Sequence, residues 1–308
     1  MSFTAIRHRI AFIGFGEAGQ ALAGGLCEAG TVEIAAWDIL FPRPAGARLL
    51  RAAETIGVRA ASSAAEAVTG ADLIISAVTA SASLAAAESV KPHLAAQQFF
   101  LDINSVSPAR KREVASAMEG HGRYVDVAVM APVHPARHRT PMLLAGPFAA
   151  ELLPVMRGMD MRVNLAGPEI GMAAAIKMIR SVMVKGLEAL SFECFVAAHR
   201  AGVTEQIFAS LQESFPGLDW RAQVQYNLER MDRHGIRRAA EMREVAKTLE
   251  ELKLDPAVTR GTIAQQQRMG ELDLPYALDG KAREAVNDTL NAVSEALKIA
   301  ETAVKEPA

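Results

Sequence analysis

The pattern of hydrophobic positions changes between the two halves of the chain. In the first half, short apolar runs typical of buried β-strands alternate with segments whose apolar residues recur at helical spacing. Such alternation predicts an α/β domain with a parallel, doubly wound Rossmann-type sheet, which binds ligands at the carboxyl ends of its strands. The expected strands are Ile10–Ile13, Val32–Trp37, a short strand edge near Val58, Leu73–Val78, Phe99–Ile103, Gly122–Met130 and Pro141–Gly146.

After Gly167 the strand pattern ends and helical spacing continues to the end of the chain. The segment from Gly171 to Gly202 contains no proline, and Gly202 is a typical helix stop. We therefore expect a dinucleotide-binding domain over residues 1–166 and an all-helical domain for substrate binding and dimerisation over residues 167–308. Further helices are expected over Thr204–Ser214, Asp219–His234, Arg238–Leu252 and Ala282–Lys305.

Three glycines follow the first expected strand at G-x-G-x-x-G spacing. Gly14 would permit a tight turn, Gly16 would let backbone N–H groups approach a pyrophosphate, and Gly19 would let the next helix pack closely on the strand. The phosphates would then lie at the helix N-terminus. A glycine-rich turn in another kind of α/β protein is the alternative, but the order of strand, glycines, helix and second strand favours dinucleotide binding.

Asp38 ends the second strand, at roughly the 20-residue offset where a carboxylate receives the ribose hydroxyls of a dinucleotide. Because a carboxylate repels a 2′-phosphate, Asp38 favours NAD over NADP. Ile39 and Leu40 offer nothing to a phosphate, whereas Arg43 leaves NADP open as the alternative. The other residues expected to contact the dinucleotide are Phe15, Glu17 and Ala18 in the glycine loop, and Val78 and Thr79 at the end of the third buried strand.

Composition limits the classes of protein to which the chain can belong. Of 308 residues, 50% are hydrophobic and 22% are charged, with a net charge of −2, which is ordinary for a globular protein and gives no general attraction to nucleic acid or anionic membranes. No apolar stretch long enough to span a membrane and no signal-like region is expected, so a cytoplasmic location is predicted. Cys27 and Cys194 lie far apart without metal-type spacing and are expected to be small core residues.

Four ordered segments resemble one family of enzymes. They are "FIGFGEAGQALAGGLCEAG" at the start, "LDINSVSP" at Leu101–Pro108, "VDVAVMAPVHPARHRTPMLLAG" at Val125–Gly146 and "GMAAAIK" at Gly171–Lys177. Together they are similar to motifs of the β-hydroxyacid dehydrogenases, the superfamily that includes 6-phosphogluconate dehydrogenase and 3-hydroxyisobutyrate dehydrogenase. The resemblance implies an NAD(P)-dependent oxidoreductase that oxidises a β-hydroxy acid or related alcohol, or reduces the matching carbonyl.

Lys177 stands where the resemblance puts the catalytic lysine. An amine can accept the hydroxyl proton as hydride leaves, provided that partial burial lowers its pKa. The alternative is a surface lysine whose stem packs on the core. The resemblance also implies that Asn104 contacts both cofactor and substrate, and that Ser105 lines the substrate.

Several positions depart from the family pattern. Ser181 replaces the usual asparagine four residues after the lysine, and Met130-Ala131-Pro132 replaces the segment that grips a carboxylate. Proline removes one backbone donor and methionine adds an apolar surface, so a larger or more apolar substrate is expected.

The lysine that the family carries in a later helix is not matched here. Arg237 and Arg238 could supply a carboxylate- or phosphate-binding guanidinium instead, or could lie on a solvated helix face paired with nearby glutamates. Val184 occupies the place of the glutamate that protonates a decarboxylation product, which argues against oxidative decarboxylation.

The sequence leaves two other functions open. An imine reductase would transfer hydride to a C=N bond, but such relatives usually lack the lysine. A dinucleotide-binding sensor without turnover would fit the departures at Met130-Ala131-Pro132. Under each hypothesis the partner is a small molecule, no metal is expected, and the resemblance implies a homodimer.

Overall fold

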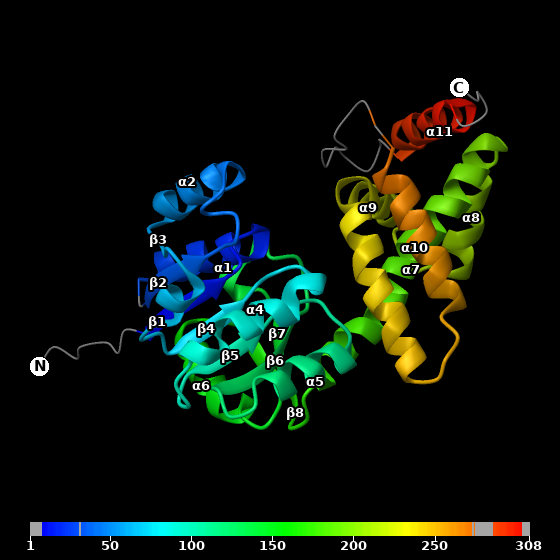
Figure 1. Cartoon of the computed structure of the whole chain (residues 1–308). Coiled ribbons are helices and arrows are strands. Elements are labelled where there is room, and N and C mark those ends of the chain that lie inside the picture. The colour runs from blue at the N-terminus through cyan, green and yellow to red at the C-terminus, as the bar shows by residue number, and fades with distance from the viewer. Residues whose placement is uncertain (1–7, 31, 273, 275–285, 304–308) are drawn as a thin grey trace, which may run out of the picture. The chain divides into compact units, whose positions relative to one another are not determined.

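The computed structural model describes residues 8–30, 32–272, 274 and 286–303. The chain forms two compact units, residues 1–177 and 178–308, which divide inside one long helix. Figure 1 shows the sheet-containing unit in blue to green and the helical unit in green to red. The expected domain boundary at residue 166 falls earlier, at the end of the last strand, and stays a prediction.

The first unit is built on an eight-stranded sheet in the order β3-β2-β1-β4-β5-β6-β7-β8. All neighbouring strands are parallel except β6 and β7. The Rossmann-type fold class is confirmed, with the antiparallel step and the last strand as additions to the expectation. The strands are β1 (His8–Ile13), β2 (Val32–Trp37), β3 (Arg59–Ala60), β4 (Leu73–Ser76), β5 (Phe99–Asp102), β6 (Arg123–Val129), β7 (Met142–Ala145) and β8 (Val163–Gly167).

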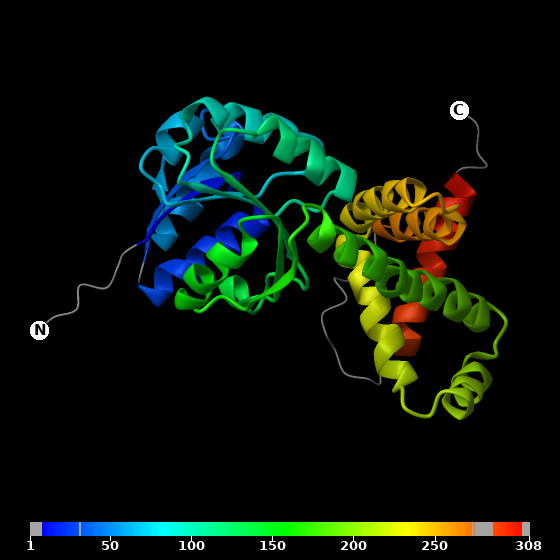
Figure 2. The ribbon, with the colours of Figure 1, turned by 90° about the horizontal axis from the view of Figure 1, so that it is seen from below.

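Helices cover both faces of this sheet (Figure 2). Side chains of β1 alternate between the two resulting cores, because successive residues of a strand point to opposite faces: Ile10 and Phe12 join one core, Ala11 and Ile13 the other. The helices of the first core are α1 (Glu17–Ala29), α2 (Ala47–Ile56) and α6 (Ala149–Gly158), and those of the second are α3 (Ala64–Val68), α4 (Ser83–Val90) and α5 (Pro108–Ala117).

Short 3-10 turns complete the unit at η1 (Pro44–Gly46), η2 (Ala80–Ala82), η3 (Lys91–His93) and η4 (Arg137–Arg139). The unit ends with the first residues of α7 (Met172–Arg200). The expected stop of this long helix is present, since Gly202 adopts a left-handed φ of 71° just beyond it.

The second unit is entirely helical in the residues described. It contains the rest of α7, then α8 (Thr204–Ser214), α9 (Trp220–Glu251), α10 (Ala257–Gly270) and α11 (Val286–Ala303). The sequence pattern missed α10. The helix expected from residue 282 to residue 305 is α11, and residues 282–285 and 304–305 lie outside the described residues.

The prediction of two helices, ending at His234 and restarting at Arg238, was wrong. α9 continues through Gly235, which serves helix packing instead of a break. A Cβ at Gly235 would lie 2.4 Å from the carbonyl oxygen of Gln266, and one at Gly270 would lie 2.6 Å from the backbone nitrogen of Ile236. The two glycines therefore let α9 and α10 touch through their backbones.

The two cysteines, which the sequence predicted to be small core residues, differ in environment. Cys27 is half-buried at the margin of a core, and Cys194 is exposed. The apolar spacing around each is helical, but it does not fix which side of the helix the cysteine occupies.

Candidate active site

The loop between β1 and α1 has the geometry expected of a phosphate-binding turn. Gly14 has a φ of 91°, and a Cβ there would lie 2.4 Å from the carbonyl oxygen of Ala77. A Cβ on Gly19 would lie 2.7 Å from the carbonyl oxygen of Gly14, so the helix packs closely on the turn. By contrast, a Cβ on Gly16 would meet no atom of the described part of the chain within 4 Å. The structure therefore requires glycine at the first and third positions for packing, while the second leaves open space.

That space adjoins the N-terminus of α1. Gly16 is the N-cap residue and no side chain caps this end of the helix, while Glu17 and Ala18 form the first turn. Helix N-terminal N–H groups and the helix dipole favour an anion. The donors present and the open space at Gly16 thus fit a dinucleotide pyrophosphate.

Asp38 follows β2 and holds the loop by both carboxylate oxygens. Oδ2 accepts a hydrogen bond from the Phe15 N–H at 2.8 Å, and Oδ1 accepts one from the Leu40 N–H at 2.9 Å. The Phe15 ring is fully buried and packs edge-on against Phe41. Phe15 therefore contributes to the loop through its backbone, not through its side chain. Asp38, which was expected to contact a ribose, also holds the shape of this loop. Arg43 is exposed further along the same loop.

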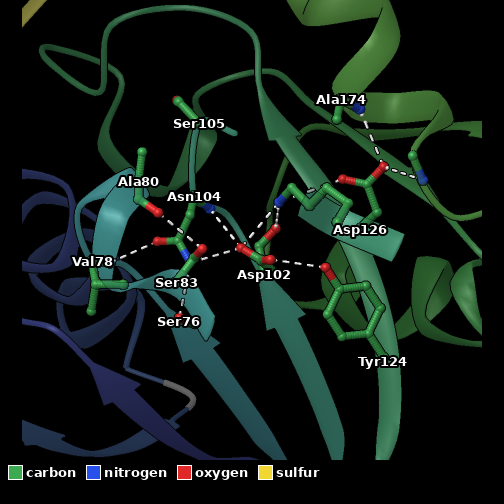
Figure 3. Close-up of polar contacts among 12 residues, drawn as sticks. Ser76, Val78, Ala80, Ser83, Asp102, Asn104, Ser105, Tyr124, Asp126 and Ala174 are labelled. Carbon is green, nitrogen blue, oxygen red and sulfur yellow. Dashed lines mark hydrogen bonds and ion pairs between the residues drawn. The ribbon is translucent and has the colours of Figure 1, made fainter. Parts of the chain in front are cut away.

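Asn104 braces the loops that follow β4 and β5. Its Oδ1 accepts a hydrogen bond from the Val78 N–H at 2.7 Å, and its Nδ2 donates to Ser76 Oγ at 3.0 Å and to Asp102 Oδ1 at 2.7 Å (Figure 3). The residue is only 5% exposed. Its amide is thus occupied by hydrogen bonds within the protein. The sequence suggested that Asn104 contacts a ligand, but its side chain is better placed to position Val78. Thr79 is exposed just beyond Val78.

Lys177 and Ser105 come together beyond the carboxyl end of β5. Lys177 Nζ donates a hydrogen bond to Ser105 Oγ over 2.6 Å, and both residues are half-buried. Ala173 is fully buried against Ala128 of β6 and Ala145 of β7, which anchors the first turn of α7 on the sheet. The amine is therefore held at the sheet edge where the fold binds ligands.

A buried carboxylate fixes the start of α7. Asp126 of β6 accepts hydrogen bonds through Oδ2 from the N–H groups of Gly171 at 3.0 Å and Ala174 at 3.2 Å. Burial raises the pKa of Asp126, while the ammonium group of Lys111 acts in the opposite direction. Sequence reasoning missed both residues, because an acid within a strand and a lysine within a basic helical segment usually face solvent.

The segment Met130-Ala131-Pro132, which departs from the motif that the sequence resembles, follows β6. The Met130 N–H donates to the carbonyl oxygen of Pro141 at 2.8 Å, and Met130 is half-buried. Ala131 and Pro132 are exposed. The segment thus presents an apolar surface after β6, as the sequence indicated.

In the helical unit, the hydroxyl of Ser181 is hydrogen-bonded to a neighbouring side chain. Its hydroxyl accepts a hydrogen bond from Lys185 Nζ at 3.2 Å, and Lys185 forms an ion pair with Glu241 of α9 at 3.1 Å. Ser181 and Lys185 are both buried. Sequence reasoning missed Lys185, although its spacing of four residues from Ser181 was a usable signal.

The two arginines of α9 differ in environment. Arg238 is buried in an ion pair with Glu188 of α7, and Glu188 also accepts a hydrogen bond from Gln266 Nε2 at 2.7 Å. Arg237 is exposed and lies 3.7 Å from Glu241 one turn later on the same helix. The guanidinium of Arg238 is therefore engaged between helices, contrary to the substrate contact suggested for it, and Arg237 follows the alternative of a helix-face ion pair.

Neither a metal centre nor a membrane span emerges from the described ranges. They contain no group of three histidine, cysteine or acidic side chains able to hold a metal ion. None of their helices has both the length and the apolar character that a membrane crossing requires.

Comparison with protein families gives two matches. A model described as "NADP oxidoreductase coenzyme F420-dependent" matches residues 9–105. A second model, described as a domain of unknown function, matches residues 198–269.

Solved structures similar to this chain include two at substantial sequence identity. A conserved hypothetical protein from Sinorhizobium meliloti is 39% identical, with 96% of this chain and 98% of that chain covered and a TM-score of 0.76. A conserved protein of unknown function, reported to be structurally similar to 3-hydroxyacid dehydrogenases, is 33% identical, with 85% and 96% covered and a TM-score of 0.69.

More distant structures share the fold alone. A 3-hydroxyisobutyrate dehydrogenase from Mycobacterium tuberculosis is 20% identical, with 92% of this chain and 99% of that chain covered and a TM-score of 0.68. An imine reductase from Streptomyces aurantiacus is 18% identical, with 94% and 99% covered and a TM-score of 0.54.

Proposed function

The chain belongs to the β-hydroxyacid dehydrogenase superfamily, and from that premise we propose that it oxidises a β-hydroxy acid or related alcohol, or reduces the matching carbonyl. The match of its first unit to an oxidoreductase model supports a dinucleotide-dependent redox enzyme. The observation that carries the finer proposal is the hydrogen bond between Lys177 and Ser105, formed in the same unit as the glycine loop.

The residues that would hold the cofactor are those of the glycine loop. Backbone N–H groups at the start of α1, beside the open space at Gly16, suit its phosphates, and the carboxylate of Asp38 suits a ribose diol. The preference proposed is therefore NAD, with NADP as the alternative. When bound, the nicotinamide supplies the hydride acceptor or donor.

Lys177 is proposed as the general acid and base. In the oxidative direction its amine takes the hydroxyl proton of the alcohol, and in the reductive direction its ammonium returns one to the alkoxide. The Ser105 hydroxyl accepts a hydrogen bond from this amine and directs it. The apolar surface at Met130 supports a substrate with an apolar part near the reacting carbon.

A substrate panel and one variant test the proposal. Purified protein is assayed with 3-hydroxy acids and β-hydroxy amino acids, with NAD and with NADP, by the absorbance of the reduced nicotinamide. Lys177→Met should lower turnover by about 10²- to 10⁴-fold and leave the Kd for NADH nearly unchanged. Lys247→Met, at an exposed lysine of α9, is the matched control and should retain turnover. Full turnover in Lys177→Met would refute the assignment of the base.

Assays of the same purified protein distinguish two alternative functions. Reduction of cyclic imines without activity on hydroxy acids would favour an imine reductase, but a lysine hydrogen-bonded to Ser105 is better suited to a hydroxyl or carbonyl oxygen. Tight NADH binding with no turnover across the panel would favour a sensor.

We also propose that the protein is a homodimer. Four large apolar side chains are exposed at helical spacing on the part of α7 within the second unit: Ile179, Met183, Leu187 and Leu190. A contiguous apolar stripe of this kind is typical of an interface. Sedimentation should give the dimer mass for the wild type and the monomer mass for Met183→Glu, whereas a monomeric wild type would contradict the proposal.

A further inference from the structure

Lys111 of α5 is a buried cation between two buried acids. It is 1% exposed, and its Nζ lies 3.0 Å from Oδ1 of Asp102 and 3.5 Å from Oδ1 of Asp126, both of which are fully buried. The ammonium also donates a hydrogen bond to the main-chain carbonyl of Asp102. Burying an ion costs several kcal/mol unless its partners offset the loss of water. The placement of this lysine therefore needs a reason beyond packing.

The two acids lie side by side in the sheet. Asp102 on β5 and Asp126 on β6 are paired in register, and like charges directly opposite one another repel. Lys111 supplies the opposite charge, and Tyr124 donates its hydroxyl to Asp102 Oδ2 at 2.8 Å (Figure 3). Burial and the nearby acids raise the pKa of Tyr124, so it remains a neutral donor.

Each acid holds backbone near one member of the Lys177–Ser105 pair. Asp102 Oδ1 accepts a hydrogen bond from the Asn104 N–H at 2.9 Å, which fixes the residue immediately before Ser105. Asp126 Oδ2 accepts hydrogen bonds from the first turn of α7, which ends one turn before Lys177. The carboxylate at that helix N-terminus is also favoured by the helix dipole.

We propose that Lys111 is a positioning residue for the reaction. It joins the carboxylate that holds the Ser105 loop to the carboxylate that holds the start of α7, and it thereby sets the geometry between the Lys177 amine and the Ser105 hydroxyl. Its effect on turnover rests on the proposed function, whereas its effect on the Lys177 amine does not.

Removal of the cation should act through Asp126. Lys111 is the main charge that lowers the pKa of Asp126, so without it the acid takes up a proton at higher pH. A neutral carboxyl is a weaker acceptor for the Gly171 and Ala174 N–H groups. The charged or titratable groups around Asp126 are Lys111 from α5, Asp102 from β5 and Tyr124 from β6, with Arg112 of α5 beside Gly171.

The kinetic test compares three variants. Lys111→Met removes the charge and keeps the length, Lys111→Arg keeps the charge, and Val114→Ala opens the core one turn later on the same helix, where Val114 is fully buried. Since a misplacement of about 1 Å can cost 10²-fold, Lys111→Met should lower kcat by about 10- to 100-fold with KM and the NADH Kd little changed. In the reductive direction, where Lys177 acts as the acid and gives no acid limb of its own, the acid limb of the pH–rate profile of Lys111→Met should move to higher pH.

The controls separate position from stability. Lys111→Arg should recover part of kcat, and Val114→Ala should lower Tm without moving the profile. Lys111→Met with wild-type kcat and an unmoved acid limb would overturn the proposal. If Lys111→Met does not fold, Asp126→Asn carries the test, since it keeps one acceptor and cannot titrate. In the reductive direction, where Lys177 acts as the acid, this variant should lose the acid limb, and an unchanged limb would overturn the proposal.

A chemical readout keeps the proposal testable without a known substrate. The pH dependence of Lys177 acetylation, followed by peptide mass spectrometry, reports the environment of its amine directly. Lys111→Met should change the rate of Lys177 acetylation several-fold and shift its pH midpoint, while Val114→Ala should not. An unchanged labelling profile in Lys111→Met would overturn the positioning role, and absence of turnover with a changed profile would instead refute only the proposed function.

Discussion

The Lys177 amine donates a 2.6 Å hydrogen bond to the Ser105 hydroxyl, although the two residues are 72 positions apart in the chain. The hydroxyl follows β5 and the amine lies in α7, so the pair depends on the tertiary fold and not on local sequence. A lysine side chain has several rotatable bonds, and a fixed acceptor restricts its amine to fewer orientations.

Ser105→Ala removes that acceptor. We expect about a 10-fold loss of kcat, because the amine is no longer held in one orientation, with the NADH Kd unchanged. Steady-state kinetics and a fluorescence titration with NADH check this. Ser105→Thr keeps the hydroxyl and should retain most activity; equal losses in both variants would show that the side-chain size matters and the hydrogen bond does not.

Gly16→Ala and Gly14→Ala should distinguish a glycine needed for ligand binding from one needed for packing. A methyl group at Gly16 would meet no atom of the residues described within 4 Å, and the backbone there has a φ of −74°, so Tm should change little. NADH affinity should fall by at least about 10-fold, since the backbone can no longer approach the pyrophosphate. Gly14→Ala should instead lower Tm, because its Cβ would collide with Ala77. Wild-type NADH binding by Gly16→Ala would contradict the phosphate assignment.

Asp38→Asn should weaken NADH binding and reduce discrimination against NADPH. An amide nitrogen cannot accept the hydrogen bond that one carboxylate oxygen now receives, either from Phe15 or from Leu40. Because the loop loses one of these internal hydrogen bonds and the ribose loses a charged acceptor, we expect the Kd for NADH to be about 10-fold weaker. The Kd values for NADH and NADPH are measured in parallel, and an unaltered ratio between them would argue against a ribose contact.

His138 should make stability sensitive to acid. It is 7% exposed, and neither ring nitrogen has a hydrogen-bond partner among the residues that the structure describes. A Cβ on Gly25 of α1 would lie 2.3 Å from Nδ1. Burial lowers its pKa, with Arg139 and Arg137 acting in the same direction and Asp160 and Glu28 against it. The unfolded chain therefore binds the proton more readily than the folded one, and stability falls as the pH drops below the unfolded value of 6.5.

Thermal unfolding between pH 7 and pH 5 measures this effect. The slope from one group cannot exceed about 1.4 kcal/mol per pH unit. His138→Leu should show a smaller loss of Tm over this range than the wild type, whereas His93→Leu, at an exposed histidine, should follow the wild type. Parallel curves for His138→Leu and the wild type would exclude His138 as the source.

The parts of the fold that the sequence predicted correctly depend on short-range signals. The turn at Gly14 and the helix after it are determined within a few residues, because a φ of 91° is readily adopted only by glycine. The strand at Val163–Gly167 was missed because it is an edge strand with a half-exposed pattern and no apolar run. The direction of β7 could not be predicted either, since side chains alternate between the two faces in the same way in parallel and antiparallel strands.

Long-range partners explain the remaining differences. From the sequence alone Gly235 predicts a helix break, because its packing against Gly270 becomes apparent only in the structure. Lys111 reads as a surface lysine until β5 and β6 bring two acids beneath α5. The candidate base at Lys177 could be predicted from a motif, but the residues that hold it could be identified only from the folded chain.

Under the proposed function, Asp38 both shapes the glycine loop and selects the nucleotide. A lineage that changed coenzyme by discarding this acid would also lose the anchors of two backbone amides. The less disruptive route would begin at an exposed neighbour such as Arg43 and leave the acid until last. Redesign of coenzyme preference in this protein should proceed in the same order.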